Sequence, residues 1–230
     1  MLFRSNVPSR SEWFGGGNEA PGLHSLLLDP RARGRVTAAI SCGGVWMSDD
    51  SAQSWRSGGK GLKATYMPPE KQEELSAQDP HRVVRCAAQP DVMWMQHHCG
   101  VYRAADAGTN WTQLHPPISD FDFAVACHPK NPDIAWYVPA TSDQQRVVKD
   151  GRLAVTKTRD GGKSWEIKDK GLPQTDAYEL IYRHGLDVDP TGECLLMGST
   201  TGALWSSDNA GDSWTLVNAH LPPIYAVRFA

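Results

Sequence analysis

Short runs of β-branched, aromatic and aliphatic residues recur along the chain, and most end at glycine, asparagine, aspartate or proline. In one unit, residues 92–96 run into the turn His97-His98-Cys99-Gly100, and residues 101–103 follow it. Similar pairs of runs lie at residues 36–40 and 45–47, and at residues 193–198 and 203–205. Runs of this length between turn residues are typical of strands joined in hairpins. The pattern therefore predicts an all-β protein of short antiparallel strands.

One turn motif occurs four times, at residues 48–55, 104–111, 158–165 and 206–214. The shared pattern is Ser/Thr-x-Asp-x-Gly-x-Ser/Thr-Trp, and the copies vary, with Ala52 in place of the glycine and Ala104 in place of the first serine. The tryptophans fall 56, 54 and 49 residues apart, and a period near fifty indicates a repeat architecture. A further strand is expected before each hairpin, at residues 23–28, 83–87, 121–127, 184–188 and 225–229. Each repeat is then a four-stranded antiparallel meander, and such sheets at this spacing predict a β-propeller.

The motif suits a tight turn between the third and fourth strands of each repeat. Aspartate can accept hydrogen bonds from N–H groups of its own turn, glycine supplies a positive φ, and tryptophan buries a large ring. Turn chemistry explains every position, so we interpret the motif as structural rather than catalytic. The fourth copy is interpreted as one residue longer, with Asp208 in the aspartate position when counted forward and Asn209 when counted back. The structural set is Asp50, Trp55, Asp106, Gly108, Trp111, Asp160, Gly162, Trp165, Asp208, Gly211 and Trp214.

The repeats predict one propeller domain over residues 1–230, with full units at residues 22–60, 81–115, 121–170 and 184–220. Residues 1–14 and 222–230 are expected to be parts of flanking blades, because Leu2-Phe3-Arg4 resembles a third strand and residues 225–229 resemble a first strand. Four large blades would form a tight ring, and unpaired edge strands are an aggregation liability. We therefore expect an open or incomplete ring.

Two other sets of residues are interpreted as structural. Trp46, Trp94, Trp136 and Trp205 recur near corresponding strand positions, which predicts that they pack in the core. The run that contains Arg31, Arg33 and Arg35 lies in a predicted turn, and we interpret it as a solvated face.

The four motifs resemble the Asp-box, or BNR, repeat of the sialidase-like β-propellers, and the resemblance extends from about residue 22 to the end of the chain. The chain looks most like the bacterial proteins called BNR-repeat glycosyl hydrolases. The same repeat occurs in proteins of other functions, so the resemblance implies a fold and leaves the activity open.

Resemblance to sialidases would imply three substrate-binding arginines, an aspartate acid/base and a Tyr–Glu nucleophile pair. The Arg-Ile-Pro motif that supplies one of those arginines is absent from this sequence. The candidate catalytic residues are Asp120, Glu179 and Tyr182, with Asp122 and Asp176 as further carboxylates for a glycosidase mechanism. An exo-sialidase-like glycoside hydrolase is therefore the alternative to a non-catalytic scaffold.

Composition narrows the classes of function. The chain has 23 Lys and Arg against 26 Asp and Glu, with no basic stripe, so nucleic-acid binding is not expected. No apolar run approaches the ~18 residues of a membrane helix, and residues 1–6 lack the apolar core of a secretory signal. The five cysteines are odd in number and have no CxxC spacing, which favours buried free thiols. These features predict a cytoplasmic protein without nucleic-acid or membrane partners.

A binding site is expected on the rim opposite the Asp motifs, where the second-to-third strand turns and the links between repeats gather. The side chains expected there are His24, His81, Arg82, His97, His98, Arg183, His184 and Tyr225. His97 and His98 are adjacent, so at most one of them should face the axis. Three histidines on one rim could ligate a metal, but no tight spacing supports this, so we predict no metal and no cofactor. The predicted function is a scaffold for a small-molecule, glycan or protein ligand.

Overall fold

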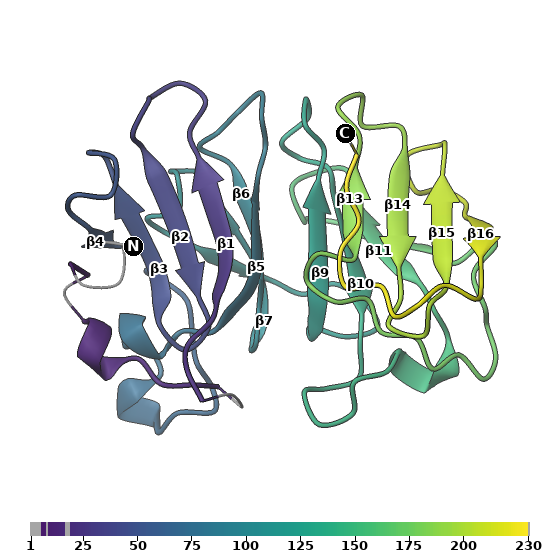
Figure 1. Ribbon diagram of the computed structural model, residues 1–230, viewed down its shortest axis with the longest axis horizontal. Helices are drawn as coiled ribbons and strands as arrows, with labels where there is room; N and C mark the ends of the chain where they lie inside the picture. The colour runs from purple at the N-terminus through teal and green to yellow at the C-terminus, as the bar shows by residue number, and fades with distance from the viewer. Residues whose placement is uncertain (1–5, 8, 17–18, 230) are drawn as a thin grey trace. The chain divides into compact units, whose positions relative to one another are not determined.

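The computed structural model describes residues 6–7, 9–16 and 19–229, and its strands form four sheets (Figure 1). Each sheet has four antiparallel strands that pair with their neighbours in chain order. The chain divides into two compact units, residues 1–113 and 114–230, and each unit is built on two of the sheets. The predicted all-β class and the four-stranded blades are confirmed.

The first unit begins with a blade of β1 (Leu23–Leu28), β2 (Val36–Ile40), β3 (Gly44–Ser48) and β4 (Arg56–Ser57). Its second blade consists of β5 (Pro80–Arg85), β6 (Met93–His97), β7 (Gly100–Ala104) and β8 (Thr112–Leu114). Short 3₁₀ turns lie before β1, at η2 (Arg10–Glu12), and in the link from β4 to β5, at η3 (Pro69–Lys71) and η4 (Leu75–Ala77).

The second unit begins with a blade of β9 (Asp122–Cys127), β10 (Ala135–Pro139), β11 (Val155–Thr158) and β12 (Glu166–Lys168). Its second blade consists of β13 (Leu186–Val188), β14 (Leu195–Gly198), β15 (Leu204–Ser207) and β16 (Thr215–Asn218). A 3₁₀ turn, η5 (Lys149–Gly151), lies in the long excursion between β10 and β11. Across the described residues, no helix has the length and apolar character that a membrane span needs.

The first strands of the blades agree with the prediction, with shifted ends, and the last predicted strand is absent. The strand predicted at residues 83–87 is β5, which begins at Pro80, and the one predicted at residues 184–188 is β13. Residues 225–229 form no strand; Ala226 makes an isolated parallel bridge to His184, and the Val227 N–H donates to the His184 carbonyl at 2.8 Å. The strand predicted at residues 2–4 falls outside the described part of the chain.

Each unit has its own apolar core, and the predicted core tryptophans lie in these cores. Trp46 and Trp94 of the first unit are 3% and 0% exposed, and Trp136 and Trp205 of the second are 0% and 3% exposed. The prediction that these tryptophans pack in the core is confirmed.

All five cysteines are free thiols.

The third Asp motif shows how the turn is held. Thr158 Oγ1 donates to Asp160 Oδ1 at 3.0 Å, and the Gly162 N–H donates to Thr158 Oγ1 at 2.9 Å. The N–H and hydroxyl of Ser164 donate to the two carboxylate oxygens of Asp160 at 2.9 and 2.6 Å. Gly162 has a φ of +90°, a conformation that glycine adopts without strain. The Asp160 carboxylate therefore accepts its hydrogen bonds from groups of its own turn.

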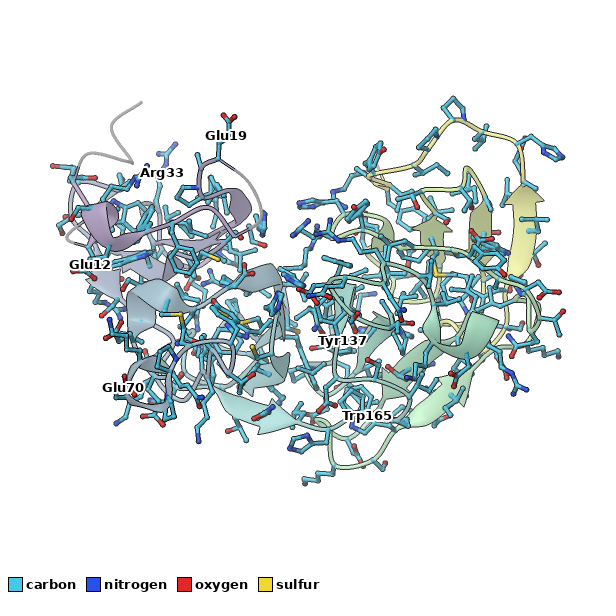
Figure 2. All side chains as sticks on the ribbon, turned by 90° about the horizontal axis from the view of Figure 1, so that it is seen from below. Glu12, Glu19, Arg33, Glu70, Tyr137 and Trp165 are labelled. Carbon is cyan, nitrogen blue, oxygen red and sulfur yellow. The ribbon has the colours of Figure 1, made fainter. Side chains whose placement is uncertain are left out.

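The hydrogen bonds that the aspartate accepts from the seventh motif position recur in the first two motifs. Asp50 accepts the N–H and hydroxyl of Ser54 at 2.9 and 2.6 Å, and Asp106 accepts the N–H and side-chain amide of Asn110 at 2.9 and 2.6 Å. Ala52 takes the glycine position of the first motif with a φ of +68°. In the third motif, the ring of its final residue, Trp165, packs edge-on against Tyr137, with centroids 5.8 Å apart (Figure 2).

The fourth motif corrects one assignment, because Asn209 rather than Asp208 holds the aspartate position. Ser207 Oγ donates to Asn209 Oδ1 at 2.9 Å, and the Ser213 N–H donates to the same oxygen at 3.0 Å. The motif thus begins at Ser207 and has the same length as the others, with no extra residue. Counting back from Trp214 gives the observed register, since the tryptophan ends every copy.

The Asp160 turn predicts a specific acid sensitivity. The hydrogen bonds from the Ser164 hydroxyl and N–H hold the pKa of Asp160 at about 2, below its ordinary 3.8. Such a carboxylate stabilises the fold above its unfolded pKa, and this contribution is lost as the pH falls through the folded pKa. We expect Asp160→Asn to be less stable than wild type at neutral pH, and the difference to shrink between about pH 4 and about pH 2. Urea denaturation across this window measures it. Asp208→Asn is the matched control and should follow wild type, whereas a pH-independent difference for Asp160→Asn would contradict the account.

A Lys-Gly-Leu segment ties the two blades of each unit together. The segments Lys60-Gly61-Leu62 and Lys170-Gly171-Leu172 follow the last strand of the first blade in each unit. The Trp111 N–H donates to the Lys60 carbonyl at 2.8 Å, and the Trp214 N–H donates to the Lys170 carbonyl at 2.9 Å. Each segment therefore binds the Asp motif of the next blade in the same unit.

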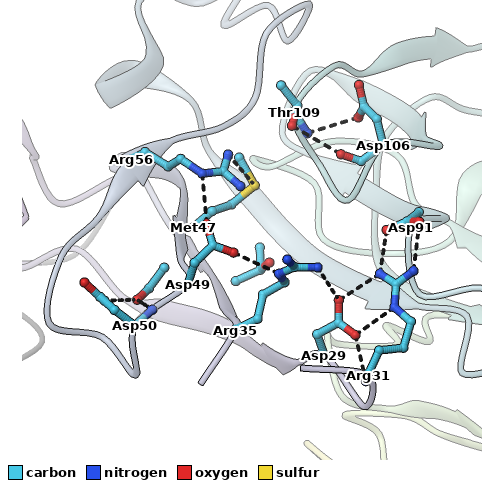
Figure 3. Close-up of polar contacts among 12 residues, drawn as sticks. Asp29, Arg31, Arg35, Met47, Asp49, Asp50, Arg56, Asp91, Asp106 and Thr109 are labelled. Atoms are coloured by element: carbon cyan, nitrogen blue, oxygen red, sulfur yellow. Dashed lines mark hydrogen bonds and ion pairs between the residues drawn. The ribbon is translucent and has the colours of Figure 1, made fainter. Parts of the chain in front are cut away.

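The arginine run is solvent-exposed, as predicted, with the side chains of Arg31 and Arg35 43% and 41% exposed, and it also forms an ion-pair network (Figure 3). Arg31 Nη2 lies 2.8 Å from Asp29 Oδ2 and 2.6 Å from Asp91 Oδ1, and Arg35 Nε lies 2.8 Å from Asp49 Oδ1. The hydrogen bond from Arg31 holds the pKa of the buried Asp29 well below its usual range. Arg31 therefore joins the two blades of the first unit at the rim of the Asp motifs.

Candidate functional site

In the first unit, the β2–β3 turn, the β6–β7 turn and the end of the β4–β5 link lie together. The Gly44 N–H donates to the Gln78 carbonyl at 3.0 Å, and the His98 N–H donates to the Asp79 carbonyl at 2.9 Å. These contacts bring three loops opposite the Asp motifs to one place. Asp79, which was not among the predicted site residues, lies where they meet.

Three of the predicted histidines contact Asp79, and a fourth contacts Pro80. Asp79 Oδ2 lies 3.5 Å from His98 Nδ1 and 3.8 Å from His81 Nε2. The Asp79 N–H lies 2.9 Å from His97 Nε2. His24 Nδ1 lies 3.0 Å from the carbonyl oxygen of Pro80. The fold thus brings together side chains that are far apart in the sequence.

The Asp79 carboxylate is buried and negatively charged. Burial raises the pKa of Asp79, but the hydrogen bond from His98, the charge of His81 and the hydroxyl of Ser41 outweigh burial and hold this pKa well below its usual range. Ser41 Oγ donates to Oδ1 at 2.8 Å, which leaves Oδ2 toward the two imidazoles. One ligand atom from each of Asp79, His81 and His98 lies within 4.8 Å of the other two. These three side chains are therefore grouped closely enough to hold a metal ion, although the sequence led us to predict no metal site.

His97 is a core residue rather than a group of the rim. It is fully buried, and burial lowers the pKa of its imidazole to about 4, so the ring is neutral at pH 7. Its two nitrogens face the backbone N–H groups of Asp79 and Cys99 at 2.9 and 3.0 Å, and a neutral imidazole can accept only one of them at a time. The ring packs edge-on against Tyr102. His97 therefore orients the backbone around Asp79.

Two of the rim histidines lie at β-bulges that the sequence did not reveal. The register of β5 with β6 shifts between Pro80 and Arg82, which leaves His81 as the extra residue. The register of β1 with β2 shifts in the same way around His24. Bulges commonly re-aim a side chain next to a functional site. Arg82, which resumes the ladder after the bulge, is 9% exposed.

The second unit has a different candidate site, which we call the arginine–aromatic patch: Phe123, Arg146, Tyr182, Arg183 and Tyr225. The guanidinium carbons of Arg183 and Arg146 lie 5.1 and 5.7 Å from the centre of the Phe123 ring. The Tyr182 ring lies 5.3 Å from the Phe123 ring and 5.8 Å from the Tyr225 ring. Phe123 is buried, whereas Tyr225 is 61% exposed. The patch therefore has an apolar base, with cationic and phenolic groups above it.

Four segments contribute to this patch. Phe123 lies in β9, Arg146 in the excursion between β10 and β11, residues 182–183 in the link before β13, and Tyr225 in the C-terminal segment. A backbone hydrogen bond of 3.1 Å, from Val148 to Glu179, joins the excursion to the link. Arg183, Tyr182 and Tyr225 were among the predicted site residues, whereas Arg146 and Phe123 were not. The length of the excursion was the only signal for Arg146, and apolar alternation marks Phe123 as a core residue.

The third rim candidate of this unit, His184, holds the C-terminal segment. Its Nδ1 lies 2.9 Å from Arg228 Nη2, so the ring nitrogen accepts a hydrogen bond from the guanidinium. Together with the bridge between His184 and Ala226, this contact places residues 225–228 beside the start of β13. His184 therefore positions the segment that carries Tyr225.

The candidate catalytic groups have separate environments. Glu179 accepts the hydroxyl of Ser199 at 2.8 Å and also that of Thr201, which ties it to the β14–β15 turn. Tyr182 belongs to the arginine–aromatic patch, and Arg146 Nη1 lies 3.4 Å from its hydroxyl. Each is thus held by a different set of neighbours.

Asp120 and Asp122 form a pair with contrasting surroundings. Asp120 is exposed and lies 3.1 Å from His115 Nδ1. Asp122 is fully buried, and burial together with the charge of Asp120 raises its pKa well above the ordinary value. Two carboxyl groups in contrasting environments resemble an acid/base pair, but Asp122 is not exposed to solvent.

The fold of this chain is shared with proteins of known structure. No protein-family model matches the sequence, and no curated protein matches it. An ancestral GH74 enzyme aligns with 84% of this chain at a TM-score of 0.62 and 16% identity, and the GH74 xyloglucanase from Xanthomonas campestris aligns with 90% at 0.56 and 16%. The fold is a β-propeller. YCF48 from Cyanidioschyzon merolae aligns with 62% of the chain at 15% identity, and its TM-score of 0.42 is too low to add to this.

The likeness to the GH74 structures concerns the fold alone, because 16% identity carries no activity across. The aligned regions cover 23% and 31% of those two proteins, so this chain spans less than a third of their length.

Proposed function

We propose that this propeller is a non-catalytic binding module, and that the arginine–aromatic patch holds an acidic peptide segment of a partner protein. The observation that supports this proposal most strongly is that Arg146 and Arg183 lie over the Phe123 ring, in the same patch as the exposed Tyr225. We also propose that the four turns are Asp boxes of the BNR type. The five free thiols support a cytoplasmic protein.

The chemistry of the patch favours such a ligand. Arginine forms paired hydrogen bonds with carboxylates, and a guanidinium held over an aromatic ring is already oriented before a ligand arrives. Tyrosine and arginine dominate the energetics of protein interfaces. Tyr225 offers a large exposed ring, and the Tyr182 ring lies beside it in a tilted arrangement. The patch thus combines anchors for a peptide backbone or ring with two cations for its carboxylates.

Fluorescence anisotropy with a labelled peptide rich in Glu and Tyr tests this proposal. Wild type should bind it more tightly than the peptide with Gln in place of Glu, and added salt should weaken binding because it screens the charges. Arg146→Ala and Tyr225→Ala should each weaken binding by about tenfold, the effect of a modest interface anchor.

Two exposed residues of the same unit serve as matched controls. Arg152 and Tyr178 are both exposed and lie outside the patch, so Arg152→Ala and Tyr178→Ala should bind as wild type does. Equal affinity for the Glu and Gln peptides, or equal binding by patch and control variants, would refute the proposal.

Glycoside hydrolysis is the second candidate, and the Asp120–Asp122 pair is the observation that favours it. A glycosidase needs one protonated and one ionised carboxyl group, and the raised pKa of Asp122 supplies the protonated one. A panel of aryl glycosides that includes a fluorogenic sialoside tests this reading. Turnover that is lost in Asp122→Asn would establish an enzyme, and the absence of turnover above buffer would remove this candidate.

A further inference from the structure

We infer that Asp79, His81 and His98 form a zinc-binding site in the first unit. The three residues come from three elements: the end of the β4–β5 link, the bulge of β5, and the β6–β7 turn. Carboxylate oxygen and imidazole nitrogen are common zinc ligands, and three protein ligands leave one position of a tetrahedral site for water or another ligand. This site is separate from the patch of the second unit.

The distances are close to those that zinc requires. Bonds of about 2.0–2.2 Å in tetrahedral geometry place ligand atoms about 3.4 Å apart. Asp79 Oδ2 lies 3.5 Å from His98 Nδ1 and 3.8 Å from His81 Nε2, and the three ligand atoms fall within 4.8 Å of one another. Small side-chain rotations would bring all three to bonding distance. The two imidazole rings meet edge to face at 5.4 Å between centroids, so neither blocks the other.

Surrounding groups hold the ligands in place. Ser41 Oγ donates to Asp79 Oδ1 at 2.8 Å, which orients the carboxylate and keeps Oδ2 toward the imidazoles. The Asp79 N–H lies against His97 Nε2, and its carbonyl accepts the His98 N–H. Neighbours of this kind typically tune metal affinity, because they fix the direction of each ligand. The Asp79 backbone and side chain are thus both positioned before any metal binds.

The site is enclosed but reachable. The side chains of Asp79 and His81 are 8% and 3% exposed, whereas that of His98 is 25% exposed and marks the open side. Tyr66 packs edge-on against His98 and donates its hydroxyl to the Ala77 carbonyl, which holds the β4–β5 link over the site. Zinc here would join that link to β5 and to the β6–β7 turn.

The test is zinc binding by the whole chain, with any affinity tag removed. The protein is stripped with a chelator and titrated with Zn²⁺ in competition with a chromophoric chelator. We expect one equivalent of zinc to bind, and thermal unfolding of the first unit to shift to higher temperature with zinc. Asp79→Asn keeps the shape and the Ser41 hydrogen bond, and it should weaken binding by at least about tenfold and abolish the thermal shift.

Two further variants keep the result interpretable. His98→Gln removes a partly exposed ligand, so it should fold as wild type does in the presence of chelator and still lose zinc affinity. His115→Ala removes an exposed histidine of the second unit and should bind as wild type does. The inference is overturned if the wild type binds no stoichiometric zinc, or if Asp79→Asn and His98→Gln bind it as wild type does. Peptide binding at the arginine–aromatic patch is unaffected by either outcome.

Discussion

Gly171→Ala is expected to lower the free energy of unfolding by more than about 4 kcal/mol, a loss larger than most single substitutions cause. A Cβ at this position would lie 1.8 Å from the Trp214 carbonyl oxygen and 2.9 Å from its carbonyl carbon. Both are backbone atoms of the fourth Asp motif, so no side-chain rotation relieves the overlap. Gly171 also has a φ of +87°, which is strained for alanine.

Gly151→Ala is the matched control for Gly171→Ala. Gly151 has a φ of +65°, but the nearest atom to its Cβ would be the Asp176 nitrogen at 3.6 Å, an ordinary contact. This variant should lower the free energy of unfolding by only about 1–2 kcal/mol, the cost of a left-handed backbone conformation for alanine. Urea denaturation followed by circular dichroism gives both values. Similar losses in the two variants would show that the Lys-Gly-Leu segment does not clamp the next blade.

Trp136→Ala is expected to destabilise the protein by about 3–5 kcal/mol, as for other large aromatic residues in cores. Trp136 is fully buried, stacks on His128 at 6.2 Å between centroids, and donates its Nε1–H to the Ala210 carbonyl at 2.9 Å. Lys157 Nζ lies 5.7 Å from the ring and also donates to the Ala210 carbonyl. The truncation therefore leaves a cavity and removes the ring that covers a buried cation.

Trp136→Phe separates these contributions. It keeps most of the apolar volume and loses the indole N–H, while Lys157 still donates to the Ala210 carbonyl at 2.6 Å. We expect a loss of about 1–2 kcal/mol, comparable to one hydrogen bond plus modest repacking. Equilibrium urea denaturation measures both variants, and a loss under about 1 kcal/mol for Trp136→Ala would contradict the assignment of Trp136 to the core.

Much of the fold was predictable because its signals are local. The Asp turn satisfies its own hydrogen bonds within eight residues, so the sequence alone shows where each third strand ends, as Asp160 illustrates. The spacing of the repeats and the alternation of strand-like runs with turns then predict the four-stranded meanders. The one error within the motif, Asp208 for Asn209, arose from fixing its start instead of its final tryptophan.

Features that depend on contacts between blades were not predictable in the same way. The clamp by Gly171 depends on a backbone carbonyl far along the chain, and nothing in the local composition marks it. Arg31 pairs with Asp91, which the sequence places in another repeat, so the ion pairs of this exposed arginine run were not predicted.

The candidate sites were predictable as a region but not as groups of atoms. The sequence placed His81 and His98 on one rim, but the bulge that makes His81 an extra residue has no signature in this segment. Asp79 precedes a proline and was not among the predicted site residues, although His81, His97 and His98 all contact it. In the second unit, Arg146 is one polar residue among many in an exposed loop, and only its position over Phe123 distinguishes it.

A charge exchange at Arg146 tests whether the arginine–aromatic patch recognises carboxylates. Arg146 is exposed, so Arg146→Glu should fold as wild type does. The measurement is the affinity of wild type and Arg146→Glu for two labelled peptides that differ only in having Glu or Lys at the charged positions. We expect the variant to bind the Glu peptide at least about tenfold more weakly than wild type does, and to bind the Lys peptide more tightly than wild type does. Unchanged affinities for both peptides would contradict it.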